Sequence, residues 1–321
     1  MIKKKLTLIF GGKSEEHEIS ILGARKIFSD LDKNKYDISF IGIDKNGVFK
    51  LLKEIPDAKA MFFEEKMILD NEIITHLMNT DIVFAILHGN NGEDGNIQGL
   101  FELLGVKYVG CDVLQSSLTI DKHMTREFLR LNNIPVVEFK MMRKGEPIPD
   151  INEYPVFVKP ASLGSSIGVT KVKSEDELSS AIEEAFKYDD KILIDKAIIG
   201  REIECAILAG EITGVGEIRP SNEFYDYEAK YFDGGMSEVI VPADISEETE
   251  NKIREYTSKI SDLLNIKTIS RVDYFVRDEE IFFNEINSIP GYTEYSMYSM
   301  LCGNIGYKGS EILDILISKV K

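Results

Sequence analysis

The stretch LTLIFGGKSEEHEISILGARKIFSDL, residues 6–31, decides the fold class of this chain of 321 residues. Leu6–Phe10 is a short and largely apolar run, as in a buried strand, and Gly11–Gly12 ends it. Apolar residues then recur at the spacing of one helix face, namely Ile21, Ala24, Ile27, Phe28 and Leu31. The stretch therefore predicts a strand, a turn and a helix, the repeating unit of an α/β fold.

The remainder of the first third continues this alternation. Residues 38–43 and 82–87 have the composition of buried strands, and the second run leads into a polar, Gly-rich loop at residues 88–95. A helical pattern follows that loop. These features predict a parallel sheet covered by helices.

Beyond Asp121 the pattern changes to short strands joined as hairpins, which places the start of a second domain near residues 111–120. The stretch Ser221–Gly235 is polar and has no clear period, and a segment of this length inside a domain is typical of a functional lid. The other elements that we expect are a helix to Leu131, strands at 135–140 and 155–159, a helix at 248–264 and a strand pair at 269–287.

The composition excludes several classes of function. The chain has 38 Lys and Arg against 55 Asp and Glu, a formal charge of −17, which argues against a nucleic-acid or anionic-membrane partner. The longest apolar run, residues 82–87, is far shorter than the roughly 20 residues that span a bilayer. The 3 cysteines are widely spaced, as free thiols in a reducing compartment are. We expect a cytoplasmic protein.

The segment RVDYFVRDEEIFFNEIN, residues 271–287, is the strongest chemical signal. If its two runs pair symmetrically about residue 279, Asp273 lies opposite Glu285 and Arg271 lies opposite Asn287, all on one face. Two carboxylates and an amide oxygen suit Mg²⁺, and a neighbouring Arg is placed to hold a developing anion. The other face would pack on the core with Val272, Tyr274, Val276, Phe282 and Ile286. A solvated polar face is the alternative.

The loop VKPASLGSSIG, residues 158–168, follows a predicted strand that ends in Lys159. Small residues let backbone N–H groups approach phosphate oxygens, so the loop is a candidate phosphate cover, although a plain hairpin turn would give a similar pattern. Lys122, at the start of a predicted helix, is a further candidate for phosphate and is otherwise a surface charge.

The acidic segment that follows the first strand, residues 13–18, includes Glu16. Ligands of open α/β sheets bind beyond the carboxyl ends of the strands, and carboxylates there suit an ammonium group. A solvated acidic helix start is the alternative, because the helix dipole favours it. His88 ends another predicted strand and would lie at the same edge, unless it is a structural histidine.

Taken together, these motifs resemble those of the D-alanine:D-alanine ligases of the ATP-grasp superfamily. The resemblance covers nearly the whole chain and is carried by residues 10–20, 87–95, 158–168, 227–231 and 284–293. It implies an α/β fold in which an N-terminal Rossmann-like (pre-ATP-grasp) domain, residues 1–111, precedes a two-part α+β ATP-grasp fold. The central subdomain would span residues 112–196, and the C-terminal subdomain, with the metal and catalytic residues, would span residues 197–321.

The implied reaction joins two D-alanine molecules to D-alanyl-D-alanine for peptidoglycan synthesis and releases ADP and phosphate. The carboxylate of the first D-alanine attacks the γ-phosphate, and the amine of the second displaces phosphate from the D-alanyl phosphate. The resemblance also implies ATP, two Mg²⁺ ions for which Mn²⁺ substitutes, and a homodimer. It leaves a K⁺ requirement open.

The resemblance also assigns roles by motif position. The implied metal ligands are Asp273, Glu285 and Asn287. The implied ATP-binding residues are Lys122, Lys159, Ser165, Ser166, Asp195, Lys196, Ile198, Glu202 and Lys230. The implied catalytic and substrate-binding residues are Glu16, His88, Ser165, Tyr231, Arg271, Gly291, Ser296 and Met297. Within these sets, Ser165 and Tyr231 would hold the lid closed, and Arg271 with the Gly291 N–H would stabilise the oxyanion. Asp195 stands where Glu is more frequent.

Three alternatives stay open. A D-alanine:D-serine ligase is the first, although the apolar Met297 offers the D-serine hydroxyl no strong partner. Another carboxylate–amine ligase of the superfamily would need different residues around Glu16, Tyr231 and Met297. A catalytically silent nucleotide-binding homologue would be expected to lack a metal ligand or a phosphate lysine.

Overall fold

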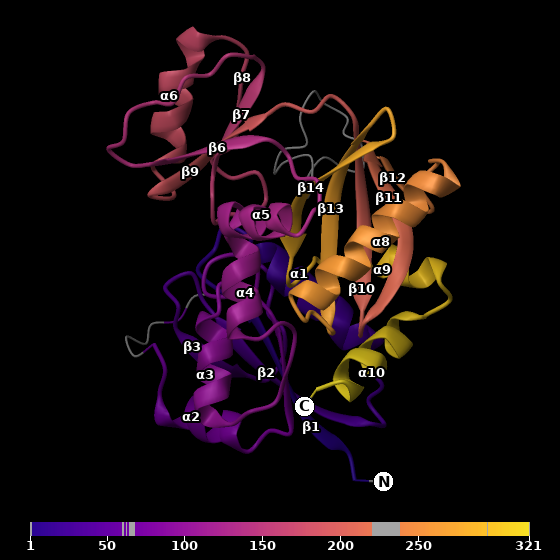
Figure 1. Cartoon of the computed structure of the whole chain (residues 1–321). Coiled ribbons are helices and arrows are strands. Elements are labelled where there is room, and N and C mark those ends of the chain that lie inside the picture. Colours follow the sequence, from indigo (N-terminus) through magenta and orange to yellow (C-terminus); the bar gives the residue numbers. More distant parts are fainter. Residues whose placement is uncertain are drawn as a thin grey trace.

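The computed structural model describes residues 2–59, 61, 63, 68–219, 238–293 and 295–320. In this part of the chain the strands form three sheets (Figure 1), and the predicted lid, residues 221–235, lies wholly outside it. Lys230 and Tyr231 also lie outside the described residues.

The first sheet has the strand order β3-β2-β1-β4-β5. Its strands are β1 (Lys4–Gly11), β2 (Tyr36–Ile43), β3 (Phe49–Leu52), β4 (Ile82–Ile86) and β5 (Tyr108–Val109). The helices between them are α1 (His17–Asp30), α2 (Asn71–Met78) and α3 (Asn96–Leu104). β1 pairs in parallel with β2 and β4, which confirms the predicted parallel sheet; the edge strand β3 is antiparallel.

The second sheet, of order β6-β9-β7-β8, is antiparallel throughout. Helices α4 (Val113–Ile120) and α5 (Lys122–Leu131) precede it in the chain. Its strands are β6 (Phe139–Arg143), β7 (Val156–Pro160), β8 (Thr170–Val172) and β9 (Lys191–Lys196), and helix α6 (Glu175–Ala185) connects β8 to β9. The strand expected at 135–140 begins only at Phe139, because the backbone of Pro135 and Val137 instead pairs with Phe283.

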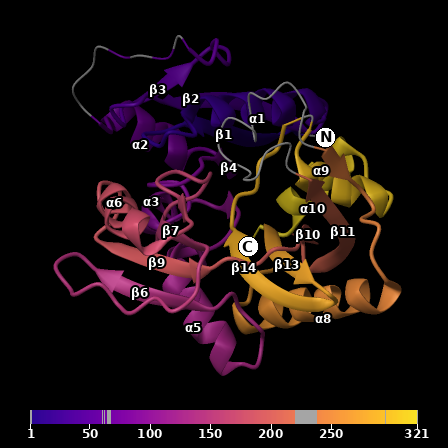
Figure 2. The same cartoon turned by 90° about the horizontal axis from the view of Figure 1, so that it is seen from above.

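The third sheet has the order β12-β11-β10-β13-β14. It contains β10 (Arg201–Leu208), β11 (Glu211–Arg219), β12 (Glu238–Ile240), β13 (Ile269–Arg277) and β14 (Glu280–Asn287), with helices α8 (Glu247–Leu263), α9 (Met297–Asn304) and α10 (Gly309–Ser318). Figures 1 and 2 show the second and third sheets side by side, with the N-terminal sheet against both.

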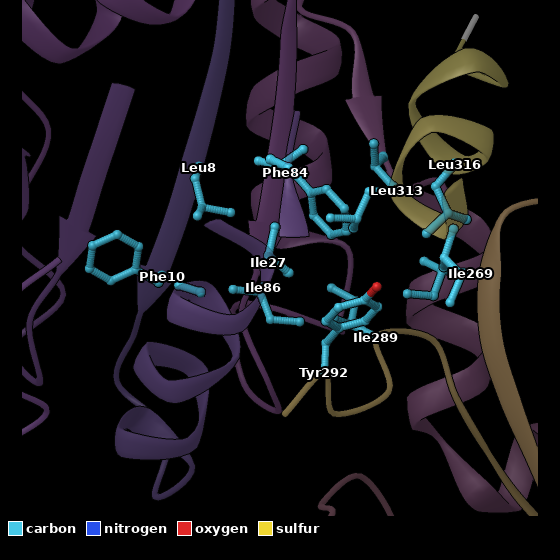
Figure 3. Close-up of a cluster of buried hydrophobic side chains, with 14 of the residues drawn as sticks. Leu8, Phe10, Ile27, Phe84, Ile86, Ile269, Ile289, Tyr292, Leu313 and Leu316 are labelled. Carbon is cyan, nitrogen blue, oxygen red and sulfur yellow. The ribbon is translucent and has the colours of Figure 1, made fainter. Parts of the chain in front are cut away.

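One apolar core joins the two ends of the chain. Leu8 and Phe84 of the first sheet belong to the same buried cluster as Leu313 and Leu316 of α10, and Ile289 and Tyr292 lie between them (Figure 3). The segment that follows β14 is therefore packed on the N-terminal sheet.

The β13–β14 hairpin confirms the predicted register at its open end, where Asp273 pairs with Glu285 and Arg271 pairs with Asn287. Nearer the turn the register shifts by one residue, so that Tyr274 pairs with Phe283 and Asn284 is the extra residue of a β-bulge. The prediction that Phe282 faces the core is consequently wrong. Ile281 and Phe283 are buried instead, and Phe282 packs against the Arg277 guanidinium.

No helix in the described ranges has both the length and the apolar character needed to cross a membrane.

Candidate active site

A cavity of about 1010 Å³ lies where the three sheets meet. Every predicted site residue that the structure describes lines it: Glu16, His88, Lys122, Lys159, Ser165, Ser166, Asp195, Lys196, Ile198, Glu202, Arg271, Asp273, Glu285, Asn287, Gly291, Ser296 and Met297. These residues come from segments far apart in the sequence, so the fold brings four of the five quoted motifs to one place. The fifth, residues 227–231, lies outside the described residues.

The open end of the β13–β14 hairpin carries the acidic face. The Asn287 side-chain amide donates to Asp273 at 2.9 Å, and the Arg271 guanidinium donates to both oxygens of Asp273 at 2.7 and 2.8 Å. Arg271 Nε also lies 2.8 Å from a Glu204 oxygen. Burial would lower the pKa of Arg271, but Asp273 and Glu204 raise it well above its ordinary value, so the guanidinium stays charged.

The donor set fits Mg²⁺. Asp273 and Glu285 supply carboxylate oxygens on adjacent strands, and Asn287, whose amide nitrogen is turned to Asp273, presents its amide oxygen as a third hard donor. Within the described ranges no three His, Cys, Asp or Glu side chains are grouped to hold a metal on their own. Water and substrate phosphate would therefore complete the coordination, as is usual for Mg²⁺.

Lys122 joins the acidic face to the candidate phosphate cover at residues 158–168, below called the phosphate loop. It is the first residue of α5, whose N-terminus is capped by Asp121, and its side chain is 8% exposed. Its Nζ lies 3.1 Å from Glu285 Oε2 and donates to the Leu163 carbonyl at 2.6 Å. An ammonium group so placed lies between the proposed metal ligands and the loop that would cover the phosphates.

A buried polar network, which the sequence did not reveal, surrounds Lys159. Arg126 is fully buried and donates to Asp195 at 2.8 Å and to the side chain of Asn284 at 2.9 Å. Lys159 Nζ lies 2.6 Å from the other oxygen of Asp195. One signal was available, because Arg126 stands four residues after Lys122 and hence on the same face of α5.

The charges in this network are strongly coupled. Burial is the main cause that lowers the pKa of Lys159 to about 8, and Asp195 offsets only part of it. Burial alone would raise the pKa of Asp195, but Arg126 and Lys159 outweigh it and hold that pKa below its ordinary value. The Asp195 carboxylate is thus ionised, and both of its oxygens already have a cationic partner before any nucleotide binds.

The phosphate loop meets the N-terminal sheet through Glu16. Ser165 and Ser166 both have positive φ, 51° and 59°, a conformation that few non-glycine residues adopt. The Ser165 hydroxyl donates to a carboxylate oxygen of Glu16, which is 7% exposed. This contact links the candidate ammonium-binding carboxylate to the loop.

His88 is accompanied by Glu93, a residue that the sequence reasoning missed. The Glu93 carboxylate accepts from the Gly89 N–H and the Ile289 N–H, each at 2.9 Å. Burial raises the pKa of Glu93; His88 and the two N–H donors lower it, whereas Glu16 adds to the rise. The signal was an acidic residue within the Gly-rich loop that already contains His88.

Two further segments complete the wall. The Ser296 hydroxyl caps the turn before α9 by accepting from the Thr293 N–H at 2.8 Å. Met297 is 4% exposed and packs on Gly216, where a Cβ atom would lie 2.3 Å from the Met297 sulfur. A side chain at position 216 would displace Met297. Glycine at this position therefore lets Met297 occupy its place in the cavity wall.

Two family models match the chain: "D-ala D-ala ligase N-terminus" over residues 5–111 and "D-ala D-ala ligase C-terminus" over residues 128–318. A D-alanine--D-alanine ligase of Thermoanaerobacter sp. (strain X514) is 41% identical over 99% of this chain and 96% of that protein.

Solved structures agree in fold. The VanG D-Ala:D-Ser ligase of Enterococcus faecalis matches with a TM-score of 0.82 and 34% identity over 99% of both chains. The D-alanine--D-alanine ligase of Bacillus anthracis complexed with ATP matches with a TM-score of 0.80 and 28% identity, over 98% of this chain and 97% of that one.

Proposed function

This chain belongs to the D-ala D-ala ligase family, and on that premise we propose that it joins two D-alanine molecules to D-alanyl-D-alanine for cell wall synthesis, with ATP converted to ADP and phosphate. The observation that carries the proposal is the cavity of about 1010 Å³, which Glu16, Lys122, the loop around Ser165 and the acidic face of the β13–β14 hairpin line together.

The residues divide the work by charge. Lys122, Lys159 and the N–H groups around Ser165 and Ser166 bind the phosphates of ATP, and Glu202, Lys196 and Ile198 line the nucleoside end of the same cavity. Asp195 acts on the phosphate end through Lys159, because its carboxylate is bound to that lysine and to Arg126. Lys230 belongs to the same proposed ATP site and lies outside the described residues.

Glu16, assisted by His88, binds the ammonium group of the first D-alanine and thereby turns its carboxylate toward the γ-phosphate. The carboxylate attacks that phosphate and ADP leaves, which gives the D-alanyl phosphate. The neutral amine of the second D-alanine then attacks the acyl carbon and expels phosphate, which takes up the proton that the amine loses. Arg271 and the Gly291 N–H stabilise the negative charge that develops on the carbonyl oxygen. The chain supplies no covalent nucleophile in this scheme, so positioning and charge account for the catalysis.

Asp273, Glu285 and Asn287 would hold Mg²⁺, for which Mn²⁺ is expected to substitute. When bound, Mg²⁺ neutralises phosphate charge. We also infer that residues 1–111 are the Rossmann-like domain and that residues 112–196 and 197–321 are the two ATP-grasp subdomains. The homodimer and the role of Tyr231 stay predictions of the family resemblance. The cytoplasmic location stays a prediction from the composition, and the resemblance leaves a K⁺ requirement open.

D-alanine is the preferred second substrate in this proposal because Met297, which packs on Gly216, gives the cavity an apolar wall that suits a methyl group. A D-Ala:D-Ser ligase is the second candidate, favoured by the similarity to the VanG structure at 34% identity.

The test measures ADP release with Mg-ATP and D-alanine alone, then with D-serine or D-lactate added, and identifies the products by mass spectrometry. We expect D-alanyl-D-alanine to dominate. A majority of D-alanyl-D-serine would leave the fold and mechanism intact but overturn the assignment of Met297, and no ADP with any D-amino acid would overturn the ligase proposal.

The metal assignment has its own test. Glu285→Gln removes one negative charge from the proposed Mg²⁺ ligands, so turnover should fall by about 100-fold and Mn²⁺ binding, followed by electron paramagnetic resonance, should weaken. The matched control is Glu280→Gln, on the same strand but at the exposed hairpin turn, where the carboxylate pairs with Arg277. Near-normal ADP formation and Mn²⁺ binding by Glu285→Gln would refute the assignment.

A further inference from the structure

The backbone of Ile289 is held from both sides by the loop that follows β4. Its N–H donates to Glu93 at 2.9 Å, and its carbonyl accepts from His88 Nδ1 at 3.0 Å. The Ser288 hydroxyl donates to the same Glu93 oxygen at 3.3 Å. A carbonyl can only accept, so Nδ1 of His88 carries the proton in this contact.

The position of Ile289 gives these bonds their significance. It lies two residues after Asn287, a proposed metal ligand, and two residues before Gly291, the proposed oxyanion donor. Ser296 and Met297, which border the second substrate, follow on the same segment. Glu93 and His88 belong to the N-terminal sheet, which also supplies Glu16 for the first substrate. The contact therefore joins the two substrate subsites.

Glu93 is well suited to hold this contact rigidly. The carboxylate accepts the Gly89 N–H with one oxygen and the Ile289 N–H with the other, so it also fixes the loop on which His88 stands. Hydrogen bonds to charged groups in water-excluded surroundings are stronger than neutral ones, and a backbone N–H that loses its partner there costs free energy. Ile289 itself is 4% exposed, so water is a poor substitute.

We propose that Glu93 is a positioning residue for the ligation step: it ties the His88 loop to the Ser288–Gly291 segment and so sets the distance between the first and second D-alanine. The inference rests on the proposed function. Glu93 contacts protein groups alone in this role, and the reacting atoms are reached through His88 and Gly291.

The variant Glu93→Gln tests the proposal with almost no change in volume. Its amide has one acceptor oxygen and one NH₂ group, so either the Gly89 N–H or the Ile289 N–H would face a donor. We expect the KM for the second D-alanine to rise about ten-fold, since a buried group left unsatisfied costs on the order of one factor of ten in equilibrium. The KM for ATP should not change, because no ATP-site contact involves Glu93.

A second readout is independent of activity. Hydrogen–deuterium exchange of the Ile289 amide should become faster in Glu93→Gln without substrates, while exchange in β13 stays as in the parent protein. The matched control is Glu102→Gln. Glu102 is an exposed residue on α3 of the same domain, and its carboxylate accepts a hydrogen bond from the Tyr108 hydroxyl. Glu93→Asp, too short to reach both N–H groups, replaces Glu93→Gln if the latter does not fold, with the same expectations.

Unchanged KM for the second D-alanine together with unchanged Ile289 exchange would overturn the proposal. A lowered melting temperature with all KM values unchanged would also overturn it, because that pattern is the signature of a purely structural carboxylate. If the parent protein forms no D-alanyl-D-alanine, the proposed function fails, whereas the exchange measurement still decides whether Glu93 holds Ile289.

Discussion

The two lysines that we propose for phosphate binding, Lys122 and Lys159, are held differently. Lys122 lies at the cavity wall between Glu285 and the Leu163 carbonyl, whereas Lys159 is buried with Arg126 and Asp195. The pKa of a buried lysine depends on the balance between burial and nearby cations, which lower it, and nearby anions, which raise it. Burial prevails for Lys159, and its pKa falls to about 8.

This pKa predicts a pH dependence of nucleotide affinity. Below pH 8 Lys159 is protonated and attracts phosphate; above pH 8 it is neutral in the free protein and the attraction is lost. The dissociation constant for Mg-ATP should therefore increase between pH 7 and pH 9, as measured by calorimetry. Lys159→Arg keeps its charge throughout and should flatten the profile. An affinity that is constant over this range in the parent protein would contradict the assignment.

The single element that most directly places a site residue is α5. Asp121 caps its N-terminus by accepting from the Met124 N–H at 3.1 Å, and its other oxygen accepts from Lys191 of β9. The cap fixes where the helix begins, and Lys122 is its first residue. A local hydrogen bond thus sets the position of Lys122, a proposed phosphate-binding residue.

Removing this cap has a predictable cost. Asp121→Ala should lower the free energy of unfolding by about 1–2 kcal/mol, because both the cap and the contact with Lys191 are lost. Asp121→Asn keeps an acceptor for the Met124 N–H and should lose clearly less. Urea denaturation midpoints of the two variants give the comparison, and equal losses would show that the cap contributes nothing.

The hairpin shows what an element reveals from its own sequence. Alternation and a turn at Asp278–Glu279 were enough to pair Asp273 with Glu285. The bulge at Asn284 was not predictable in this way, because it depends on the buried partners of Asn284. The Arg126 guanidinium donates hydrogen bonds to the backbone carbonyl of Asn284 at 3.0 Å and to the side-chain oxygen of Asn284 at 2.9 Å.

At the scale of the whole molecule, Arg126 connects the second and third sheets. From α5 it reaches Asp195 at the end of β9 and Asn284 on β14, so that two walls of the proposed nucleotide site share one fully buried guanidinium. A buried ion pair contributes little net stability compared with apolar packing, but removal of one partner leaves the other charge uncompensated.

Arg126→Met should accordingly lower the free energy of unfolding by about 3 kcal/mol, the lower end of the usual range because Lys159 remains beside Asp195. The matched control is Arg130→Met, one turn further along α5. The Arg130 side chain is 63% exposed and pairs with Glu127. The control should lose less than about 1 kcal/mol. Equal losses for the two variants, measured by urea denaturation, would contradict the role of Arg126.

The sequence by itself determined the element types of the N-terminal sheet, the register at the open end of the catalytic hairpin and the chemistry of each motif. These properties are encoded locally: apolar spacing distinguishes strands from helices, and side-chain type decides which ligands a motif can bind. Lys159 and Glu285 were identified for this reason.

Only the tertiary structure decided which residues act together. The bond between Glu93 and Ile289, the Arg126–Asp195 pair and the Asn284 bulge each depend on groups that are close in space and distant in sequence. Burial turns these contacts from exposed ion pairs or hydrogen bonds of small net effect into ones that are costly to break, because water cannot replace the lost partner. A linear pattern contains the side chains but neither their partners nor their distance from water.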